Sequence, residues 1–385
     1  MASVFINKFF KPHWFILAFS LAAVIVSVQL YLLPPGPFWG GIYTRYNNYV
    51  IFKQSFFHLL EHKNLYVQYP AEYGDFFKYS PTFALLFAPF SVLPTLSGLI
   101  AWNLLNVFML VFALLKLPGL KHPENYWILL IIAIELITSS QSCQSNALIA
   151  ASMIMGFTLV KKEKYLAAAM LISLGTFIKI YCILGFLVFF FAPNKKKFFF
   201  SSVVAMATLL ILPALLIGFS ELMWQYKNWG TLLTWDMNDS VGSSVYGISY
   251  VMTGSTRFKL ALQVMGVVLL IIPLFFITKR EEKKQLQYLA YVLMWMVLFN
   301  HKAESATFII AFTGAAIWFF TTKRNYITVA LFILCFTFCC LSQTDLFPKT
   351  LRAEFITYHV KAWPFVFVFV ACLMDLLKKK TIVAV

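Results

Sequence analysis

A succession of long apolar runs, separated by short basic clusters, is the feature that most constrains what this chain can fold into. Hydrophobic residues make up 61% of its 385 residues and charged residues only 12%, with a mean hydropathy of +0.79. A soluble domain is roughly half apolar and a quarter charged, so the composition is that of an integral membrane protein. Because about 20 apolar residues cross a bilayer, no large soluble domain fits, and a cytosolic enzyme is excluded. We expect a single integral membrane domain over residues 1–385.

The basic residues orient the predicted spans. The chain has 31 Lys and Arg against 15 Asp and Glu, a net charge of +16. Polytopic proteins concentrate such an excess on cytoplasmic loops, so it does not by itself indicate nucleic acid. We therefore expect a multi-pass plasma (inner) membrane protein with both termini in the cytoplasm, and the two longest polar connections, 35–80 and 219–258, outside the cytoplasm. The basic clusters that define the inner side are Lys8 with Lys11, 161–164, 195–197, 279–284, 323–324 and 378–380.

The apolar runs predict an all-α polytopic protein with about eleven to thirteen transmembrane helices. In the second half the expected spans alternate sides consistently: 198–218, 259–277, 285–299, 305–321, 326–342 and 360–376. In the first half the runs are 14–33, 81–96, 99–117, 126–139 and 145–160. Five crossings cannot join two stretches that both lie inside, so one run is re-entrant or interfacial, or the Lys161 cluster lies outside. The segment Tyr165–Ala192 is one kinked helix or two short helices that meet near Lys179.

Ionisable residues within the apolar runs are candidate functional groups, because a charge in a bilayer is costly. Glu135 lies in the fourth run, Lys179 interrupts an otherwise continuous apolar segment, and Asn300–Glu304 forms a polar turn between two spans. Each also has an ordinary interpretation, as a helix end at the interface or as part of a structural ion pair. Lys179 has apolar flanks on both sides, which favours an anion-binding role. The six cysteines lie in or beside apolar runs, without zinc-ligand spacing, and are interpreted as small hydrophobic residues.

The first outer loop contains an amphipathic segment between Asn47 and Lys63. Its apolar positions can share one side of a helix, while polar residues occupy the rest. This predicts an interfacial helix lying along the membrane surface. An enzyme that docks a lipid headgroup would use such a helix, whereas a simple channel has little use for it. The apolar positions are Val50, Ile51, Phe56, Phe57, Leu59 and Leu60, and the polar ones are Lys53, Gln54, His58, Glu61 and His62.

From this loop onward the sequence resembles the polyprenyl-phosphate-dependent glycosyltransferases of the GT-C superfold, specifically glycosyltransferase family 87 (GT87), which includes mycobacterial mannosyltransferases. The order and spacing of several short motifs carry the resemblance over residues 46–254. They are Asn64-Leu65-Tyr66, Lys78-Tyr79-Ser80-Pro81, Ala88-Pro89 with Leu93-Pro94, Ala101-Trp102 with Leu104-Leu105-Asn106, Gln144 with Asn146, Lys179, and Asn238-Asp239-Ser240 with Gly247. The resemblance implies a GT-C-like helical bundle whose extracytoplasmic first loop carries interfacial helices.

Three positions depart from the family pattern. Members usually carry an aspartate, the expected general base, where this chain has Asn48, and an amide cannot accept a proton at neutral pH. Cys143 stands at a glycine position and Cys182 at a proline position, which puts the local backbone geometry in question.

The resemblance implies transfer of a hexose, mannose in particular, from a polyprenyl-phosphate sugar to a lipid or cell-envelope glycan acceptor on the outer face of the membrane. Such a displacement needs a carboxylate to take the proton and a cation to steady the departing phosphate. The candidate bases are Asp75, Glu72 and Glu304. The candidate phosphate-binding residues are Lys179, Lys78, Arg45, His301 and Lys302. The residues expected to bind substrate are Asn48, Tyr66, Tyr79, Gln144, Asn146, Asn238 and Asp239.

We expect no metal and no cofactor, because the outer carboxylates are scattered and no Asp-x-Asp pair is present. A nucleotide-sugar donor is disfavoured, since no glycine-rich phosphate loop occurs. Two other hypotheses about the function stay open. A transporter or flippase for a lipid-linked sugar would share the spans and the buried lysine, but predicts repeated halves. A catalytically inactive scaffold would account for Asn48.

Overall fold

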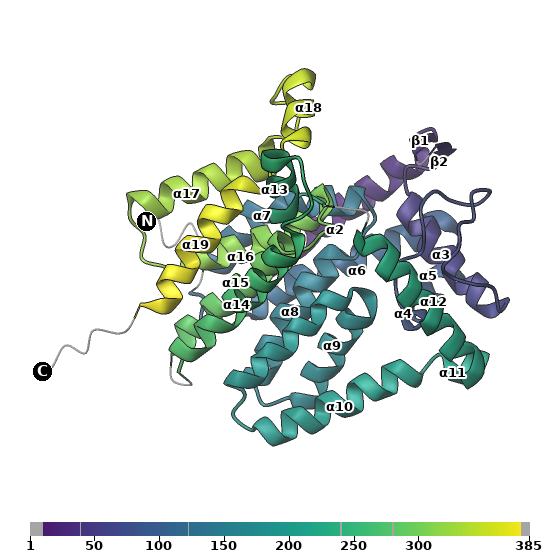
Figure 1. Ribbon diagram of the computed structural model, residues 1–385, viewed down its shortest axis with the longest axis horizontal. Helices are drawn as coiled ribbons and strands as arrows, with labels where there is room; N and C mark the ends of the chain where they lie inside the picture. Colours follow the sequence, from purple (N-terminus) through teal and green to yellow (C-terminus); the bar gives the residue numbers. More distant parts are fainter. Residues whose placement is uncertain (1–10, 39, 122, 239–240, 279–280, 379–385) are drawn as a thin grey trace, which may run out of the picture. The chain divides into compact units, whose positions relative to one another are not determined.

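The computed structural model describes residues 11–38, 40–121, 123–238, 241–278 and 281–378 (Figure 1). The chain separates into two compact units. Unit 1 comprises Met1–Leu117 and Leu136–Asp239, and unit 2 comprises Pro118–Glu135 and Ser240–Val385. Helices dominate the described residues and several are long and apolar enough to cross a bilayer, so the prediction of an all-α polytopic membrane protein is confirmed. The assignment of the whole chain to a single domain stays a prediction.

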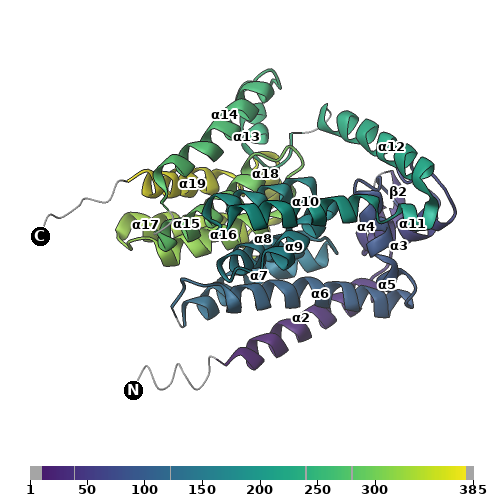
Figure 2. The same cartoon turned by 90° about the horizontal axis from the view of Figure 1, so that it is seen from below.

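Unit 1 opens with α2 (Pro12–Leu32), which lies along α6 (Thr95–Lys116) (Figure 2). In their interface the Asn103 side-chain amide donates to Ser27 Oγ at 2.9 Å. Between α2 and α6 the chain forms a short hairpin, β1 (Gly36–Phe38) with β2 (Gly41–Tyr43), and the helices α3 (Asn47–Leu60), α4 (Pro81–Leu86) and α5 (Ala88–Ser91). The later elements of unit 1 are α8 (Asn146–Lys161), α9 (Tyr165–Ile178), η1 (Ile180–Phe191), α10 (Lys195–Ile211), α11 (Ala214–Ile217) and α12 (Phe219–Asn238).

Helix α7 (Glu124–Gln141) belongs to unit 2 up to Glu135 and to unit 1 from Leu136. The core of unit 2 is the pair α15 (Glu282–Leu298) and α16 (Phe308–Thr321), whose residues are largely buried. Gly314 lets these helices approach closely, because a Cβ there would lie 2.5 Å from the Ala290 carbonyl oxygen. The other elements of unit 2 are α13 (Val245–Thr253), α14 (Lys259–Ile271), η2 (Ile272–Phe276), η3 (Ser305–Thr307), α17 (Tyr326–Phe336), the π-helix η4 (Thr337–Leu341), α18 (Lys349–Thr357) and α19 (Trp363–Leu377).

One expected span of the first half is not a continuous helix. The run 81–96 folds as α4 and α5, of 6 and 4 residues, with Pro89 at the start of α5. A helix this short spans roughly 10 Å, so 81–96 is not one membrane-spanning helix, and it fits the alternative that one of the five runs is re-entrant or interfacial. The proline ring removes a backbone donor and ends the preceding turn.

The segment Tyr165–Ala192 folds as two short helices, α9 and η1, with Lys179 between them. The start of α9 and the end of η1, both distant from Lys179, lie together, because the backbone N–H of Asn194 donates to the Tyr165 hydroxyl at 3.0 Å. Close packing near the other end depends on Gly175, where a Cβ would lie 2.4 Å from Cys182 Sγ. The segment is therefore a helical hairpin with Lys179 at its tip, and the basic residues at 161–164 and 195–197 flank its open end.

The amphipathic segment of the first loop forms α3, as predicted. Two residues depart from the predicted pattern: Leu60, expected at an apolar position, is 40% exposed, and His58, expected at a polar position, is only 2% exposed. Its Nε2 contacts the Glu72 carboxylate at 3.0 Å, and its ring lies against Tyr69 with 3.9 Å between the ring centroids. Glu72 satisfies Nε2, whereas the buried Nδ1 has no hydrogen-bond partner among the described residues, and α3 packs against its own loop on this face.

Candidate active site

The turn between α7 and α8 is a left-handed turn in the interior of unit 1. Cys143 has φ 52°, is fully buried, and accepts a hydrogen bond at its carbonyl oxygen from Trp102 Nε1 at 2.9 Å. A side chain with positive φ costs about 1–3 kcal/mol unless the surroundings enforce it, and glycine adopts it most easily. The backbone thus has a glycine-type conformation at Cys143, where the sequence resemblance leads us to expect glycine, and the buried indole helps to hold it.

Lys179 projects towards this turn from the tip of the α9–η1 hairpin. Its Nζ donates to Asn146 Oδ1 at 2.6 Å and to Gln144 Oε1 at 3.2 Å, and Asn146 Nδ2 donates to the same Gln144 oxygen at 2.8 Å. The 14 residues of α9 extend about 21 Å, so Lys179 lies far from the basic end of the hairpin. These amide oxygens orient the ammonium but are neutral, and they do not cancel its charge.

The first loop is tied to both of these segments. Asn48 Nδ2 donates to the Ser142 carbonyl oxygen at 2.8 Å, and Ser80 Oγ donates to the Phe177 carbonyl oxygen at 2.5 Å. The Tyr66 hydroxyl donates to the Tyr79 carbonyl oxygen at 3.0 Å, inside the loop. Six residues predicted from the sequence to bind substrate or phosphate thus have described partners in unit 1: Lys179 contacts Gln144 and Asn146, Asn48 contacts the turn ahead of Gln144, and Tyr66 contacts Tyr79.

Beside Ser80, Lys78 lies between two carboxylates. Its Nζ contacts both oxygens of Asp75, at 2.8 and 2.9 Å, and lies 3.7 Å from Asp236 Oδ1. Helix α12 positions this group, because Trp229 Nε1 donates to the Lys78 carbonyl oxygen at 3.1 Å and Asp236 follows two turns later on the same helix face. Asp236 is 5% exposed. It belongs to the polar connection 219–258, which is expected outside the cytoplasm.

Two other predicted residues have local partners elsewhere in the first loop. Glu72 contacts His58 Nε2 at 3.0 Å. Arg45 is exposed and its Nε donates to the Pro34 carbonyl oxygen at 3.1 Å, where its guanidinium lies against Gly36 of the β1–β2 hairpin. A Cβ at Gly36 would come within 2.5 Å of that guanidinium. Arg45 thus stabilises the β1–β2 hairpin, and no contact described here joins it to Lys179, Gln144 or Asn146.

The remaining predicted residues belong to the end of α12 and to unit 2. The side chain of Asn238 and the whole of Asp239 lie outside the described residues. His301, Lys302 and Glu304 share the turn between α15 and η3, and the Glu304 carboxylate caps η3 in a capping box with Thr307. A capping carboxylate has a structural reason to be present, so Glu304 has a role in the fold whether or not it has one in catalysis.

A segment ahead of α13 packs against this turn within unit 2. The Ser243 N–H donates to the Ala303 carbonyl oxygen at 2.6 Å, and Gly242, with φ 55°, approaches so closely that a Cβ would lie 2.6 Å from the His301 oxygen. Ser243 Oγ contacts His359 Nδ1 at 3.1 Å. Burial lowers the pKa of His359 below its usual 6.5, so its imidazole is neutral near pH 7.

Sequence reasoning marked Glu135 as a buried charge but missed its partner. Lys361 Nζ lies 3.0 Å from each carboxylate oxygen of Glu135, and the two residues are 3% and 1% exposed. They are 226 positions apart, which no local pattern can reveal. The available signal was compositional: Lys361 is a lone base at the start of the last apolar run, and a lone acid in another run needs a counter-charge.

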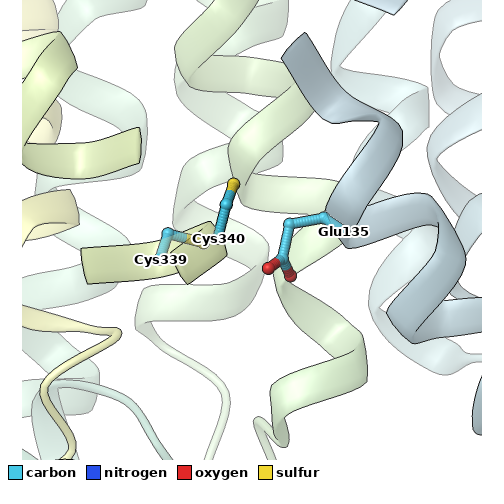
Figure 3. Close-up of side chains that lie close together, drawn as sticks. All are labelled: Glu135, Cys339 and Cys340. Atoms are coloured by element: carbon cyan, nitrogen blue, oxygen red, sulfur yellow. The ribbon is translucent and has the colours of Figure 1, made fainter. Parts of the chain in front are cut away.

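Among the described residues, one group has the composition of a metal site: the ligand atoms of Glu135, Cys339 and Cys340 lie within 4.8 Å of one another, and all three residues are buried (Figure 3). The Lys361 ammonium, however, already contacts both Glu135 oxygens. A metal cation would have to displace this ammonium or bind beside it, against its charge. The donor set therefore fits a buried ion pair better than a metal centre.

The chain matches the family model described as glycosyltransferase family 87 over residues 76–344. That stretch contains the α7–α8 turn, the α9–η1 hairpin with Lys179, Lys78 with Asp236, and the 300–304 turn. No curated protein matches the chain. With well over half of its length matched and its fold that of a polytopic membrane protein, the chain belongs to glycosyltransferase family 87.

Proposed function

We propose that this glycosyltransferase moves a hexose, mannose in particular, from a polyprenyl-phosphate donor to a lipid or cell-envelope glycan acceptor at the outer face of the plasma membrane. The observation that carries the proposal is Lys179 itself: a lysine at the tip of an apolar helical hairpin, oriented by Gln144 and Asn146, in a segment joined to the first loop. A polar group of this kind within a helical bundle is a binding site by default.

Lys179 is suited to a phosphate that gains charge as its bond to the sugar breaks. The acceptor oxygen attacks the anomeric carbon, the bond from that carbon to the phosphate oxygen breaks with its electron pair on the phosphate, and a base takes the acceptor proton. An ammonium fixed beside the departing phosphate stabilises that charge. The amides of Asn48, Gln144 and Asn146 both donate and accept hydrogen bonds, which suits sugar hydroxyl groups.

The proposed base is Asp75, and Lys78 controls whether its carboxylate is free to accept a proton. In the structure Lys78 holds both Asp75 oxygens. A donor phosphate competes for the same ammonium, since both are oxyanions. When Lys78 turns to the phosphate, Asp75 is released to take the acceptor proton. Glu72 and Glu304, engaged by His58 and by the η3 cap respectively, are the alternative bases.

The lipid parts of the donor and acceptor are proposed to lie against the apolar exterior of the helices. Helix α2, for example, exposes Leu17, Leu21 and Ile25 along one side, each more than half accessible. Side chains spaced four residues apart form one face of a helix, and an isoprenoid chain packs on such a face as membrane lipid does. This arrangement places the headgroup in the polar site and the tail in the bilayer.

The test is a transfer assay on the purified protein in lipid vesicles. Radiolabelled polyprenyl-phosphate mannose and other hexose donors are supplied with envelope lipid and glycan acceptors. Wild type is expected to transfer label, and Lys179→Met, which keeps length but removes charge, is expected to transfer about 100-fold to 1,000-fold more slowly. The matched control is Lys164→Met, at the open end of the same hairpin, which should keep its rate.

Two results contradict the proposal. If wild type transfers no label from any of the donors, the protein is not this kind of transferase, and movement of intact donor across the bilayer would instead identify a flippase. If Lys179→Met transfers at the wild-type rate, Lys179 does not stabilise the departing phosphate.

A further inference from the structure

The Glu135–Lys361 ion pair has a third partner. Lys361 Nζ also lies 3.0 Å from Ser305 Oγ and 3.4 Å from the Ser305 carbonyl oxygen. An ammonium has three N–H donors, which match the two Glu135 oxygens and Ser305 Oγ. Ser305 Oγ in turn donates to Gln343 Oε1 at 2.7 Å. Four separate stretches of unit 2 are thereby joined: α7, the start of η3, the segment after η4, and the residue two positions ahead of α19.

Ser305 directly follows the turn 300–304, so this network fixes one end of that turn. Its middle is fixed by the hydrogen bond from Ser243 to Ala303 and by the close approach of Gly242. The turn carries His301, Lys302 and Glu304, which the sequence predicts for phosphate binding or catalysis. Lys361 is 3% exposed and cannot reach a substrate itself. Any effect of the ion pair on transfer must therefore act through the position of the turn.

Stability alone does not explain why a lysine and a glutamate occupy these places. Replacing a buried ion pair with apolar side chains of similar size is often neutral or stabilising, whereas removing one partner leaves an uncompensated charge. An apolar pair would hold α7 and α19 equally well. It could not donate a hydrogen bond to Ser305, which is the contact that distinguishes a lysine here.

We propose that Lys361, held in place by Glu135, is a positioning residue that fixes the 300–304 turn for glycosyl transfer through its hydrogen bonds to Ser305. The inference rests on the proposed glycosyltransferase reaction. Lys361 supplies the donor N–H groups, Glu135 neutralises the buried ammonium, and Ser305 transmits the restraint to the turn. Loss of any of these contacts leaves the turn free to move while the helices stay packed.

The test compares variants of the full chain in detergent or lipid. Ser305→Ala keeps the ion pair and removes the hydroxyl, and Ser305→Thr restores it. The double variant Glu135→Leu with Lys361→Met replaces the ion pair with apolar side chains of similar size. The matched control is Thr322→Ala, which removes a 2.6 Å hydrogen bond to the partly buried Asp375 elsewhere in unit 2. Three quantities are measured: thermal unfolding, hydrogen exchange of the amides in 300–307, and kcat and KM for transfer.

Ser305→Ala and the double variant are expected to unfold near the wild-type temperature and to exchange the turn amides about tenfold faster, because a hydrogen bond to a charged group is lost. Their kcat/KM should fall at least about tenfold, because the free energy of the lost hydrogen bond corresponds to such a factor. Ser305→Thr and Thr322→Ala should keep the wild-type values. Unchanged exchange in the double variant overturns the inference, whatever the activity. Faster exchange with unchanged kcat/KM also overturns it. If wild type transfers nothing, the proposed function fails, and the exchange data still decide whether Lys361 positions the turn.

Discussion

Asn48 stands where related chains are expected to carry an aspartate, and in this structure its side chain acts as a donor. The amide nitrogen donates to the Ser142 carbonyl oxygen at 2.8 Å, which joins α3 to the turn that precedes Gln144. A carboxylate can only accept hydrogen bonds when ionised. The same position therefore has a structural role here that an aspartate could not fill, and a base, if the reaction proceeds as proposed, must come from another residue.

Substituting Asn48→Asp should therefore destabilise the protein. The ionised carboxylate would face a carbonyl oxygen and leave that oxygen without its donor, at a cost of about 1–3 kcal/mol. Asn48→Ala should cost less, because it removes the donor without adding a charge. Thermal unfolding of the two variants measures the difference. An Asn48→Asp protein as stable as wild type would show that the hydrogen bond to Ser142 does not restrain α3.

At the scale of helices, the α9–η1 hairpin depends on a small residue at the contact between its arms. A Cβ at Gly175 would lie 2.4 Å from Cys182 Sγ but 3.3 Å from Cys182 Cβ. Gly175→Ala is expected to destabilise the protein by about 1–3 kcal/mol through overpacking. Adding Cys182→Ala should recover most of that loss, because it removes the sulfur atom that clashes. Unfolding midpoints of the two single variants and the double variant give the coupling, and additive effects would contradict this packing.

The sequence predicted several elements and could not settle others. Long apolar runs and the amphipathic pattern of α3 gave the helices, because burial periodicity is local information. The odd number of runs in the first half indicated that one of them is re-entrant or interfacial, but only the break at Pro89 in the structure points to 81–96. The break at Lys179 was foreseen as one of two alternatives. Deciding between them required the contact of Asn194 with Tyr165, which joins the two ends of the hairpin.

For the whole molecule, the site residues fall into two classes of predictability. Asn48, Gln144 and Asn146 were identified through the family resemblance, and Lys179 also as a lone base in an apolar run; the structure joins these segments in unit 1. Lys361 was missed because its partner Glu135 is distant in sequence, and only the fold brings them into contact. Charge balance in a bilayer predicts that a partner exists without identifying it.

The proposed reaction requires that the first loop, with Lys179 beside it, faces the outside of the cell. Labelling of single cysteines on intact cells with a membrane-impermeant maleimide tests it most directly, because the six native cysteines are all buried. Gln68→Cys lies at an exposed position of the first loop, and Lys196→Cys at an exposed position of a basic cluster expected inside. The account predicts that intact cells label Gln68→Cys but label Lys196→Cys only after permeabilisation. Labelling of Lys196→Cys on intact cells, with Gln68→Cys protected, would contradict it.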